Sequence, residues 1–258
     1  MCDGFVSKIK NAFSRELPAS EVFVFDEVGS TNDEARSFAL SDRGRDAFFI
    51  AKEQSAGKGR RGRSFVSREG GLYITYLCHP KLKVRDSVML TVFSAVALSE
   101  VIEEMTLAKP GIKWVNDVFL GGKKLCGILA EGGISADGET FDYAVVGIGV
   151  NLHGTVLSPE IEKIATTLEK ESGIRVDISE LAVRLAKKLS SFETELSASY
   201  MESYRKRCFI IGKRVKMTSA GEEFFADVLR IENDGAITVR LDTGEEKSFY
   251  SAEVGVVL

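Results

Sequence analysis

Short apolar runs and helical periodicities alternate along most of the chain. Apolar runs of about four to eight residues between glycines or polar residues predict strands, and apolar side chains at positions i, i+3 and i+4 predict helices. The periodicity predicts a long helix over 86–105, and another helix is expected to begin at Thr31, which stands in capping-box spacing with Glu34. The remaining predicted elements are strands over 22–26, 46–52, 72–78, 112–114, 117–120, 124–131 and 143–150, and helices over 159–171 and 178–206.

The pattern changes to strands and turns beyond residue 212. Asp-Gly and Thr-Gly dipeptides separate short apolar runs there, which is typical of antiparallel strands. We expect strands over 213–218, 223–232, 236–241 and 247–250, which together would form a small antiparallel β-barrel. The predicted fold class is therefore α+β, with a mixed-sheet domain over 1–210 and a small C-terminal β-barrel over 211–258.

One predicted strand carries two glycines on the same face. Gly147 and Gly149 stand two positions apart in the run over 143–150, and the side chains of a strand alternate between its faces. One face of this strand is therefore bare backbone. Such a surface indicates close contact with a ligand or with another part of the backbone, and the sequence leaves both interpretations open.

The most unusual segment is the loop over 57–63, in which four cations are interleaved with three glycines. A packed core disfavours this composition, because glycine costs backbone entropy and clustered cations repel one another. Free N–H groups and guanidinium groups bind phosphate or carboxylate oxygens. A dinucleotide loop is excluded because a strand pattern follows, and a Walker loop is excluded because Gly59 follows Lys58 and Lys52 stands where the first glycine should be. The loop predicts a phosphate site, with a solvated basic loop as the alternative.

Composition limits the classes of function. Lys and Arg number 34 and Asp and Glu 38, which gives a net charge of −4, so the basic loop stands on an acidic background. Generic nucleic-acid binding is disfavoured, because it usually requires a basic domain. Four scattered cysteines indicate reduced thiols and a cytoplasmic location. The pattern shows neither a membrane span nor a signal-peptide core, and two histidines make a His-rich metal site improbable.

Polar residues at predicted strand ends suggest a site with two chemically different ends. The loop over 57–63 offers positive charge, and the segments 113–117 and 124–131 add lysines, a carboxylate and an apolar wall. A small carboxylic acid that is joined to a nucleotide phosphate would suit such a site. Neutral donors and acceptors, which suit an amide or a urea, come from Ser30, Thr31, Asn32 and Gln54.

Six motifs occur in an order that resembles the biotin protein ligase family. They are STN (30–32), EQSAGKGRRGR (53–63), GGLYIT (70–75), KWVND (113–117), KKLCGILAE (123–131) and GIGVN (147–151). The resemblance implies a catalytic domain related to class II aminoacyl-tRNA synthetases and lipoate ligases, followed by a small barrel. It also implies a two-step reaction. Biotin and ATP form biotinyl-adenylate, and a specific lysine of a biotin carboxyl carrier protein then takes the biotinyl group.

The resemblance also assigns roles to residues. Arg60, Lys124 and Asp117 are implied to be catalytic: Lys124 would reach the biotin carboxyl or phosphate oxygen, and Asp117 would act either as a metal partner or as an orienter of the lysine. ATP and Mg²⁺ are implied, with the metal ligands unidentified. The ureido ring of biotin would bind Ser30, Thr31, Asn32 and Gln54. The other implied binding residues are Gly57, Lys58, Gly59, Arg63, Lys113, Trp114, Asn116, Gly127, Gly147, Gly149 and Asn151.

Three positions depart from the family pattern. Lys58 stands where arginine is usual, and a lysine cannot bind two oxygens in a planar fork. Val115 replaces a proline and removes its backbone restraint, and Phe65 replaces a frequent tryptophan. About 21 residues precede Val22, too few for the DNA-binding domain of repressor-type members, so the ligase-only form without specific DNA binding is expected.

Two alternative functions stay open. A lipoate or octanoate ligase of the same superfamily would use similar chemistry, but the complete basic loop and the C-terminal barrel favour biotin. A non-catalytic nucleic-acid-binding protein fits less well, because the region 213–258 is balanced in charge and has no basic aromatic stripe. The expected partner is the carrier protein. Membrane partners are not expected, and a homodimer is left open.

Overall fold

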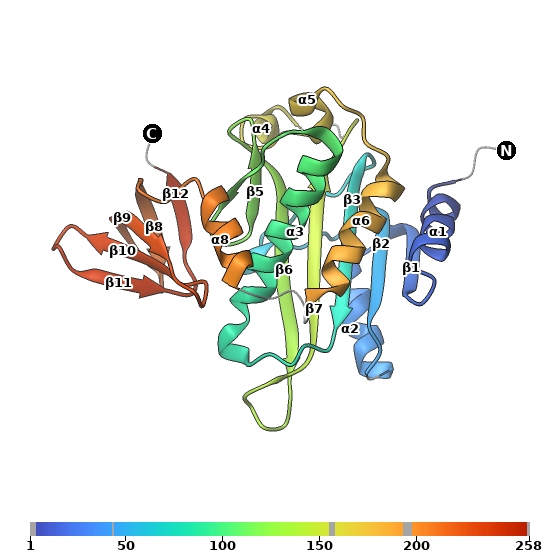
Figure 1. Cartoon of the computed structure of the whole chain (residues 1–258), viewed down its shortest axis with the longest axis horizontal. Coiled ribbons are helices and arrows are strands. Elements are labelled where there is room, and N and C mark those ends of the chain that lie inside the picture. The colour runs from blue at the N-terminus through green and yellow to red at the C-terminus, as the bar shows by residue number, and fades with distance from the viewer. Residues whose placement is uncertain (1–3, 43, 155–157, 193–197, 257–258) are drawn as a thin grey trace.

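A seven-stranded mixed sheet forms the larger part of the protein (Figure 1). The computed structural model describes residues 4–42, 44–154, 158–192 and 198–256, without the side chains of residues 198, 199 and 256. The strand order is β1-β2-β3-β7-β6-β5-β4, and β1 runs parallel to β2 whereas the other neighbours pair antiparallel. The strands are β1 Glu21–Val28, β2 Ala47–Gln54, β3 Gly71–Cys78, β4 Gly111–Lys113, β5 Asp117–Leu120, β6 Lys123–Ile134 and β7 Phe141–Asn151.

Helices cover both faces of this sheet, because its central strands are apolar on both sides. The helices α1 (Phe5–Glu16), α3 (Val88–Thr106) and α6 (Ile178–Ser190) pack on one face, where they share a core with Phe48 and Ile50 of β2. The helix α2 (Thr31–Ser41) lies on the other face against Ala47 and Phe49. The alternation along β2 thus separates two hydrophobic cores. Within the described ranges, no helix combines the length and apolarity needed to cross a bilayer.

The face that carries α2 also carries the two glycines of β7. Val145 of β7 packs in the core under α2, and Gly147 and Gly149 follow on the same side of the strand. In the neighbouring strands they pair with Thr75 and Tyr73 of β3. Beyond the amino-terminal end of α2, this face of β7 therefore carries no side chains at positions 147 and 149.

A second sheet of five antiparallel strands follows (Figure 1, red). Its order is β11-β10-β9-β8-β12. The four strands predicted in this region are present, and the fifth, β12, was not predicted because it is short and follows an irregular polar stretch. The division into domains after residue 210 stays a prediction. The strands are β8 Arg214–Ser219, β9 Glu222–Ile231, β10 Ile237–Leu241, β11 Glu246–Phe249 and β12 Glu253–Val256.

The two sheets are joined by hydrogen bonds from the larger part to the backbone of the smaller. The indole nitrogen of Trp114 donates to the carbonyl of Gly235 at 2.9 Å, and Nε of Arg205 donates to the carbonyl of Ile231 at 2.7 Å. Gly235 has a φ of 81°, and a methyl group added there would lie 2.7 Å from Cγ1 of Val88. The glycine turn therefore fits closely between the two parts.

Two predicted helices differ from the structure. The prediction of one helix over 178–206 was wrong, because α6 ends at Ser190 and α8 spans Ala198–Arg207, with residues 193–197 outside the described part. The prediction over 159–171 was also wrong, since two short helices, α4 (Pro159–Glu162) and α5 (Leu168–Ser172), occupy it. Between them the chain hydrogen-bonds to the backbone of Lys124 on both sides, and this tertiary pairing replaces helical bonds. The helix α1 and the single turns η1 (Arg60–Gly62) and η2 (Val84–Asp86) were not predicted.

We expect Gly235→Ala to lower the free energy of unfolding by about 2–4 kcal/mol, since it adds a steric clash to an unfavourable φ. The matched control is Gly244→Ala, where φ is 86° and no atom lies within 4 Å of the added methyl group. This control should lose only about 1 kcal/mol. Urea unfolding curves measure both values. Equal losses at the two positions would show that the contact with Val88 carries no constraint.

Candidate active site

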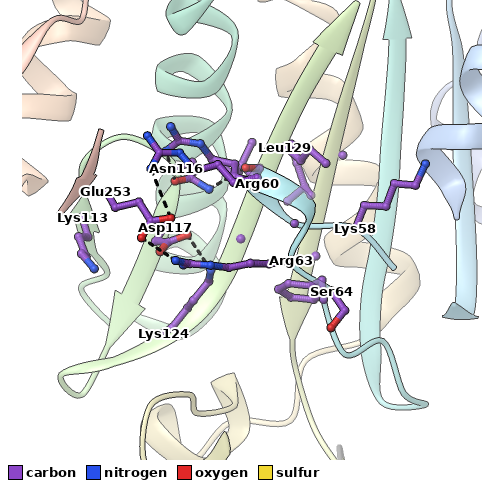
Figure 2. A pocket seen from close by; sticks show the side chains of 18 of the residues that line it. Lys58, Arg60, Arg63, Ser64, Lys113, Asn116, Asp117, Lys124, Leu129 and Glu253 are labelled. Atoms are coloured by element: carbon purple, nitrogen blue, oxygen red, sulfur yellow. Dashed lines mark hydrogen bonds and ion pairs between the residues drawn. The ribbon is translucent and has the colours of Figure 1, made fainter. Parts of the chain in front are cut away.

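A cavity of about 370 Å³ opens over the glycine face of the larger sheet. The loop over 57–63 and the strands β8 and β12 of the second sheet line it, and Figure 2 shows the loop residues Arg60 and Arg63 together with Glu253 of β12. All of the predicted site residues line it except Gly57 and Asn151. The structure therefore brings together predicted residues from five of the six motifs, and the sixth, GGLYIT, contributes Tyr73, which was not predicted. The predicted residues that line the cavity are Ser30, Thr31, Asn32, Gln54, Lys58, Gly59, Arg60, Arg63, Lys113, Trp114, Asn116, Asp117, Lys124, Gly127, Gly147 and Gly149.

The two exceptions lie behind the cavity wall. Gly57 is buried at the base of the loop, where an added methyl group would lie 2.4 Å from the carbonyl oxygen of Phe65 and 2.6 Å from Oγ of Ser67. Asn151 is buried at the end of β7, opposite Gly71 of β3. Gly57 is thus required for close packing of the loop, and the ligand contacts expected for both residues stay predictions.

Each flank of the basic loop contacts a carboxylate from elsewhere in the chain. Nζ of Lys58 lies 2.5 Å from Oδ1 of Asp33 in α2. Two arginines contact Glu253 of β12, Arg63 at 2.5 Å and Arg61 at 3.5 Å. Figure 2 shows Arg63 and Glu253 at one end of the cavity and Lys58 apart from them. The loop is folded over the cavity by these contacts, which argues against a merely solvated basic loop.

Arg60 occupies the middle of the cavity wall. Its guanidinium donates to Oδ1 of Asn116 at 3.1 Å and to Oγ of Ser251 at 3.3 Å. Burial lowers the pKa of Arg60, and the neighbouring charge of Arg61 lowers it further. An arginine stays protonated in proteins. Its burial therefore leaves an electrostatic cost that a bound anion would relieve.

Lys124 and Asp117 form an ion pair beside this arginine. Nζ of Lys124 lies 2.7 Å from Oδ1 of Asp117 (Figure 2). The β5–β6 hairpin holds both residues, and its turn at Gly121 and Gly122 has positive φ angles at both positions, as glycine permits. The contact supports the second of the two roles left open for Asp117, that of orienting the lysine.

The neutral end of the cavity is built around Thr31. The expected Thr31–Glu34 capping box was wrong, because Ser30 is the N-cap residue and no side chain caps the helix. The hydroxyl of Thr31 instead lies 3.0 Å from Oε1 of Gln54, which also accepts from the backbone N–H of Thr31 at 2.8 Å. A tertiary hydrogen bond has replaced the local one.

Side chains of the protein itself face the glycines of the floor. An added methyl group would lie 2.1 Å from Oδ1 of Asn32 at Gly147, and 2.5 Å from the ring of Phe65 at Gly149. Gly127 of β6 pairs with Gly149 and also faces this ring. The bare face therefore admits an amide at one point and an aromatic ring at another, and it borders the cavity. The sequence left open whether this face contacts a ligand or another part of the backbone. The nearest groups are side chains, so close contact with backbone is not observed.

Several lining residues come from the C-terminal sheet and were not predicted. Glu253 is the most informative, because it is the carboxylate that contacts Arg61 and Arg63. No motif marks it in the sequence, since its position depends on how the second sheet docks. The lining residues that were not named among the predicted site residues are Arg61, Ser64, Phe65, Tyr73, Ile128, Leu129, Ile148, Lys216, Thr218, Ala252, Glu253, Val254 and Gly255.

Comparisons with known proteins relate the chain to one family of ligases. The family model described as "Biotin/lipoate A/B protein ligase family" matches residues 26–151, and that described as "Biotin protein ligase C terminal domain" matches residues 210–256. A biotin–[acetyl-CoA-carboxylase] ligase of Paracoccus denitrificans is 31% identical over 226 residues, covering 84% of this chain and 93% of the relative. The bifunctional ligase/repressor BirA of Bacillus subtilis is 26% identical over 255 residues, covering 96% and 78%.

A solved structure shows the same fold. The biotin protein ligase from Aquifex aeolicus in complex with biotin and ATP superimposes with a TM-score of 0.76 at 26% identity, covering 92% of this chain and 98% of that one. The fold and the site thus define a protein ligase of the biotin and lipoate class. Within that class the chain belongs to the biotin protein ligase family. The resemblance and the α+β fold predicted from the sequence are confirmed.

We expect Lys113→Met to raise the free energy of unfolding at neutral pH by roughly 0.5–2 kcal/mol. Burial lowers the pKa of Lys113, so its charged form is less stable in the folded protein than in the unfolded chain. This cost is complete below the folded-state pKa and disappears as the pH rises above the unfolded-state pKa. The stabilisation by methionine should fade accordingly in alkaline buffer.

Denaturant titrations at neutral and alkaline pH measure this effect. Lys109→Met is the matched control, because Lys109 is exposed nearby and should show no gain. A loss of stability in Lys113→Met at neutral pH would contradict the assigned cost.

Proposed function

We propose that this protein is an ATP-dependent ligase that activates biotin as biotinyl-AMP and transfers it to a lysine of a biotin carboxyl carrier protein. The observation that carries the proposal is the cavity with one cationic end and one neutral hydrogen-bonding end, in a chain of the biotin protein ligase family. Biotin needs both ends, because it has a neutral ureido ring and an ionised carboxylate.

The neutral end receives the ureido ring in this proposal. Ser30, Thr31 and Asn32 are buried at this end, and each side chain there can donate or accept. The apolar part of biotin lies along the glycine floor and beside Leu129. A floor without side chains lets the bicyclic ring approach the sheet closely.

The cationic end holds the reacting groups. In the first step a carboxylate oxygen of biotin attacks the α-phosphorus of ATP, and pyrophosphate leaves. Lys124 stabilises the negative charge on the carboxylate and phosphate oxygens, and its ion pair with Asp117 at 2.7 Å keeps the ammonium group in place. Arg60 and Arg63 contact the phosphate oxygens, whereas Lys58 supplies a single point charge.

The second step is an acyl transfer. The amine of the acceptor lysine attacks the carbonyl carbon of the mixed anhydride, AMP leaves with the bonding electron pair, and the amine loses a proton. Water would destroy the anhydride, so a loop and a second sheet that close over the cavity protect the intermediate. The acceptor lysine then has to reach the anhydride through the part of the cavity that the loop leaves open.

Magnesium is proposed to accompany ATP. Mg²⁺ is usually held by substrate phosphates and one or two carboxylates. Asp117 and Glu253 are the carboxylates that line the cavity, and both contact cations. Among the described residues there is no cluster of three or more histidine, cysteine or acidic side chains that could hold a metal. The carrier protein as partner and a cytoplasmic location are likewise proposed.

Biotin-dependent exchange of labelled pyrophosphate into ATP tests the first step. We expect exchange with biotin and magnesium, and little exchange when lipoate or octanoate replaces biotin, because neither has a ureido group for the neutral end. Transfer to a carrier domain should follow the same order of preference. Equal or better use of lipoate would move the assignment to the related ligases.

We expect Arg60→Gly to release biotinyl-AMP about 10- to 100-fold faster, the effect of losing a hydrogen bond of roughly 1.5–3 kcal/mol to a charged group. Escaped adenylate should increase biotin labelling of bystander lysines in an added protein. Arg68→Gly is the matched control, because Arg68 is an exposed arginine outside the set of residues that line the cavity. It should change labelling by less than about twofold. Unchanged retention in Arg60→Gly would place the phosphate contact elsewhere.

A further inference from the structure

We propose that Glu131 is a positioning residue that sets the orientation of the Asn32 amide, and thereby the hydrogen-bonding pattern offered to the neutral ring of the substrate. The proposal rests on the proposed function, because it concerns how the same cavity distinguishes its ligand. Glu131 lies outside the set of residues that line the cavity. Its influence on the ligand therefore passes through Asn32.

Glu131 joins Asn32 to the surface of the protein. Nδ2 of Asn32 lies 3.0 Å from Oε2 of Glu131, and a guanidinium nitrogen of Arg36 lies 2.9 Å from Oε1 of the same carboxylate. Asn32 is 5% exposed, whereas the side chain of Glu131 is 29% exposed. A buried amide is thus tied to an ion pair at the protein surface.

The donors and acceptors around Asn32 allow only one orientation of its amide group. A carboxylate only accepts hydrogen bonds, so the amide group that faces Glu131 has to be the NH₂. The oxygen Oδ1 then points to the opposite side, where the hydroxyl of Thr75 lies 2.7 Å away and can donate to it. The orientation follows from the chemistry of the partner and does not depend on telling oxygen from nitrogen.

A second fixed point lies at the other end of this network. The backbone N–H of Thr31 can only donate, so its partner in Gln54 has to be the amide oxygen. The amide nitrogen of Gln54 then donates to Oγ of Ser67 at 2.8 Å. Thr75 joins the two halves, because its hydroxyl lies 2.8 Å from that of Thr31. Glu131 therefore fixes the amide of Asn32, and one backbone N–H fixes the amide of Gln54. The single proton of Thr75 goes to Asn32, so the hydroxyl of Thr31 lies between two acceptors, Oγ1 of Thr75 and Oε1 of Gln54.

The orientation matters because Asn32 lies at the cavity floor. Its Oδ1 occupies the space that a side chain at position 147 would fill, since an added methyl group on Gly147 would lie 2.1 Å from it. Gly147 thus leaves room for an acceptor oxygen beside the ring site. A rotated amide would present a donor there and would place its oxygen against the carboxylate of Glu131, which leaves two acceptors facing each other without a hydrogen between them. Glu131 prevents that rotation.

A reciprocal exchange of donor and acceptor tests this assignment. Asn32→Asp places two carboxylates against each other, and we expect the KM for biotin to rise at least tenfold, the loss of about one hydrogen bond to a charged group. Glu131→Gln should also raise this KM, because the new amide cannot accept from both Arg36 and Asn32. The double variant should bind biotin better than Asn32→Asp, since the introduced glutamine would donate to the introduced aspartate and accept from Arg36. The KM for ATP should stay within about twofold in all three variants.

The rescue separates positioning from a merely structural role, which would give losses that add together. Glu34→Gln is the matched control, because it removes one carboxylate from an exposed site on the same helix, and it should leave both KM values unchanged. Thermal unfolding of each variant verifies that it is folded. A double variant no better than Asn32→Asp, or parallel losses for biotin and ATP, would overturn the proposal. If the unmodified protein showed no biotin-dependent exchange, the proposed function itself would fail.

Discussion

The repulsion between cations that converge on one cavity is the constraint on which the rest of the site depends. Six positively charged side chains line it in the larger part of the chain: Lys58, Arg60, Arg61, Arg63, Lys113 and Lys124. Like charges gathered around one cavity oppose folding unless opposite charges lie nearby. The carboxylates that contact them are Asp33 of α2, Asp117 of β5 and Glu253 of β12. Each comes from a different element, so the site forms only when the entire fold has formed.

These carboxylates compensate the flanks of the cavity more than its centre. Arg60 contacts the neutral side chains of Asn116 and Ser251, and burial lowers its pKa. Burial likewise lowers the pKa of Lys113. A phosphate that contacts Arg60 would find a group whose charge is incompletely compensated. A buried cation with neutral partners therefore lies where the reacting phosphate is proposed to bind.

The succession of strands along the chain could be predicted from the sequence, because it depends on local patterns, whereas the identity of most cavity residues was implied by the resemblance of six ordered motifs to a known family. Gly147 and Gly149 mark a bare face through simple alternation, and the structure places that face at the cavity. Thr31 shows where local reasoning fails. Its spacing to Glu34 is that of a cap, but Gln54, distant in the sequence, takes the hydrogen bond instead.

Residues that reach the site only because distant segments of the chain pack together could not be predicted. Glu253 belongs to a short strand without a motif, and it enters the site because the second sheet packs against the loop. Glu131 lies inside a predicted motif, but its partner Asn32 is 99 positions away in the sequence. The break between α6 and α8 is a further example, because helical periodicity alone continues through it.

The contacts of Glu253 also bear on how such enzymes change during evolution. Because one carboxylate in the C-terminal sheet contacts two arginines of the loop, neither segment can exchange freely with that of a relative whose charges differ. A chimera whose C-terminal sheet comes from such a relative leaves Arg61 and Arg63 without their carboxylate partner, unless the loop is exchanged as well. The loop and the C-terminal sheet are separated by about 190 residues in the sequence, yet their charges have to change together.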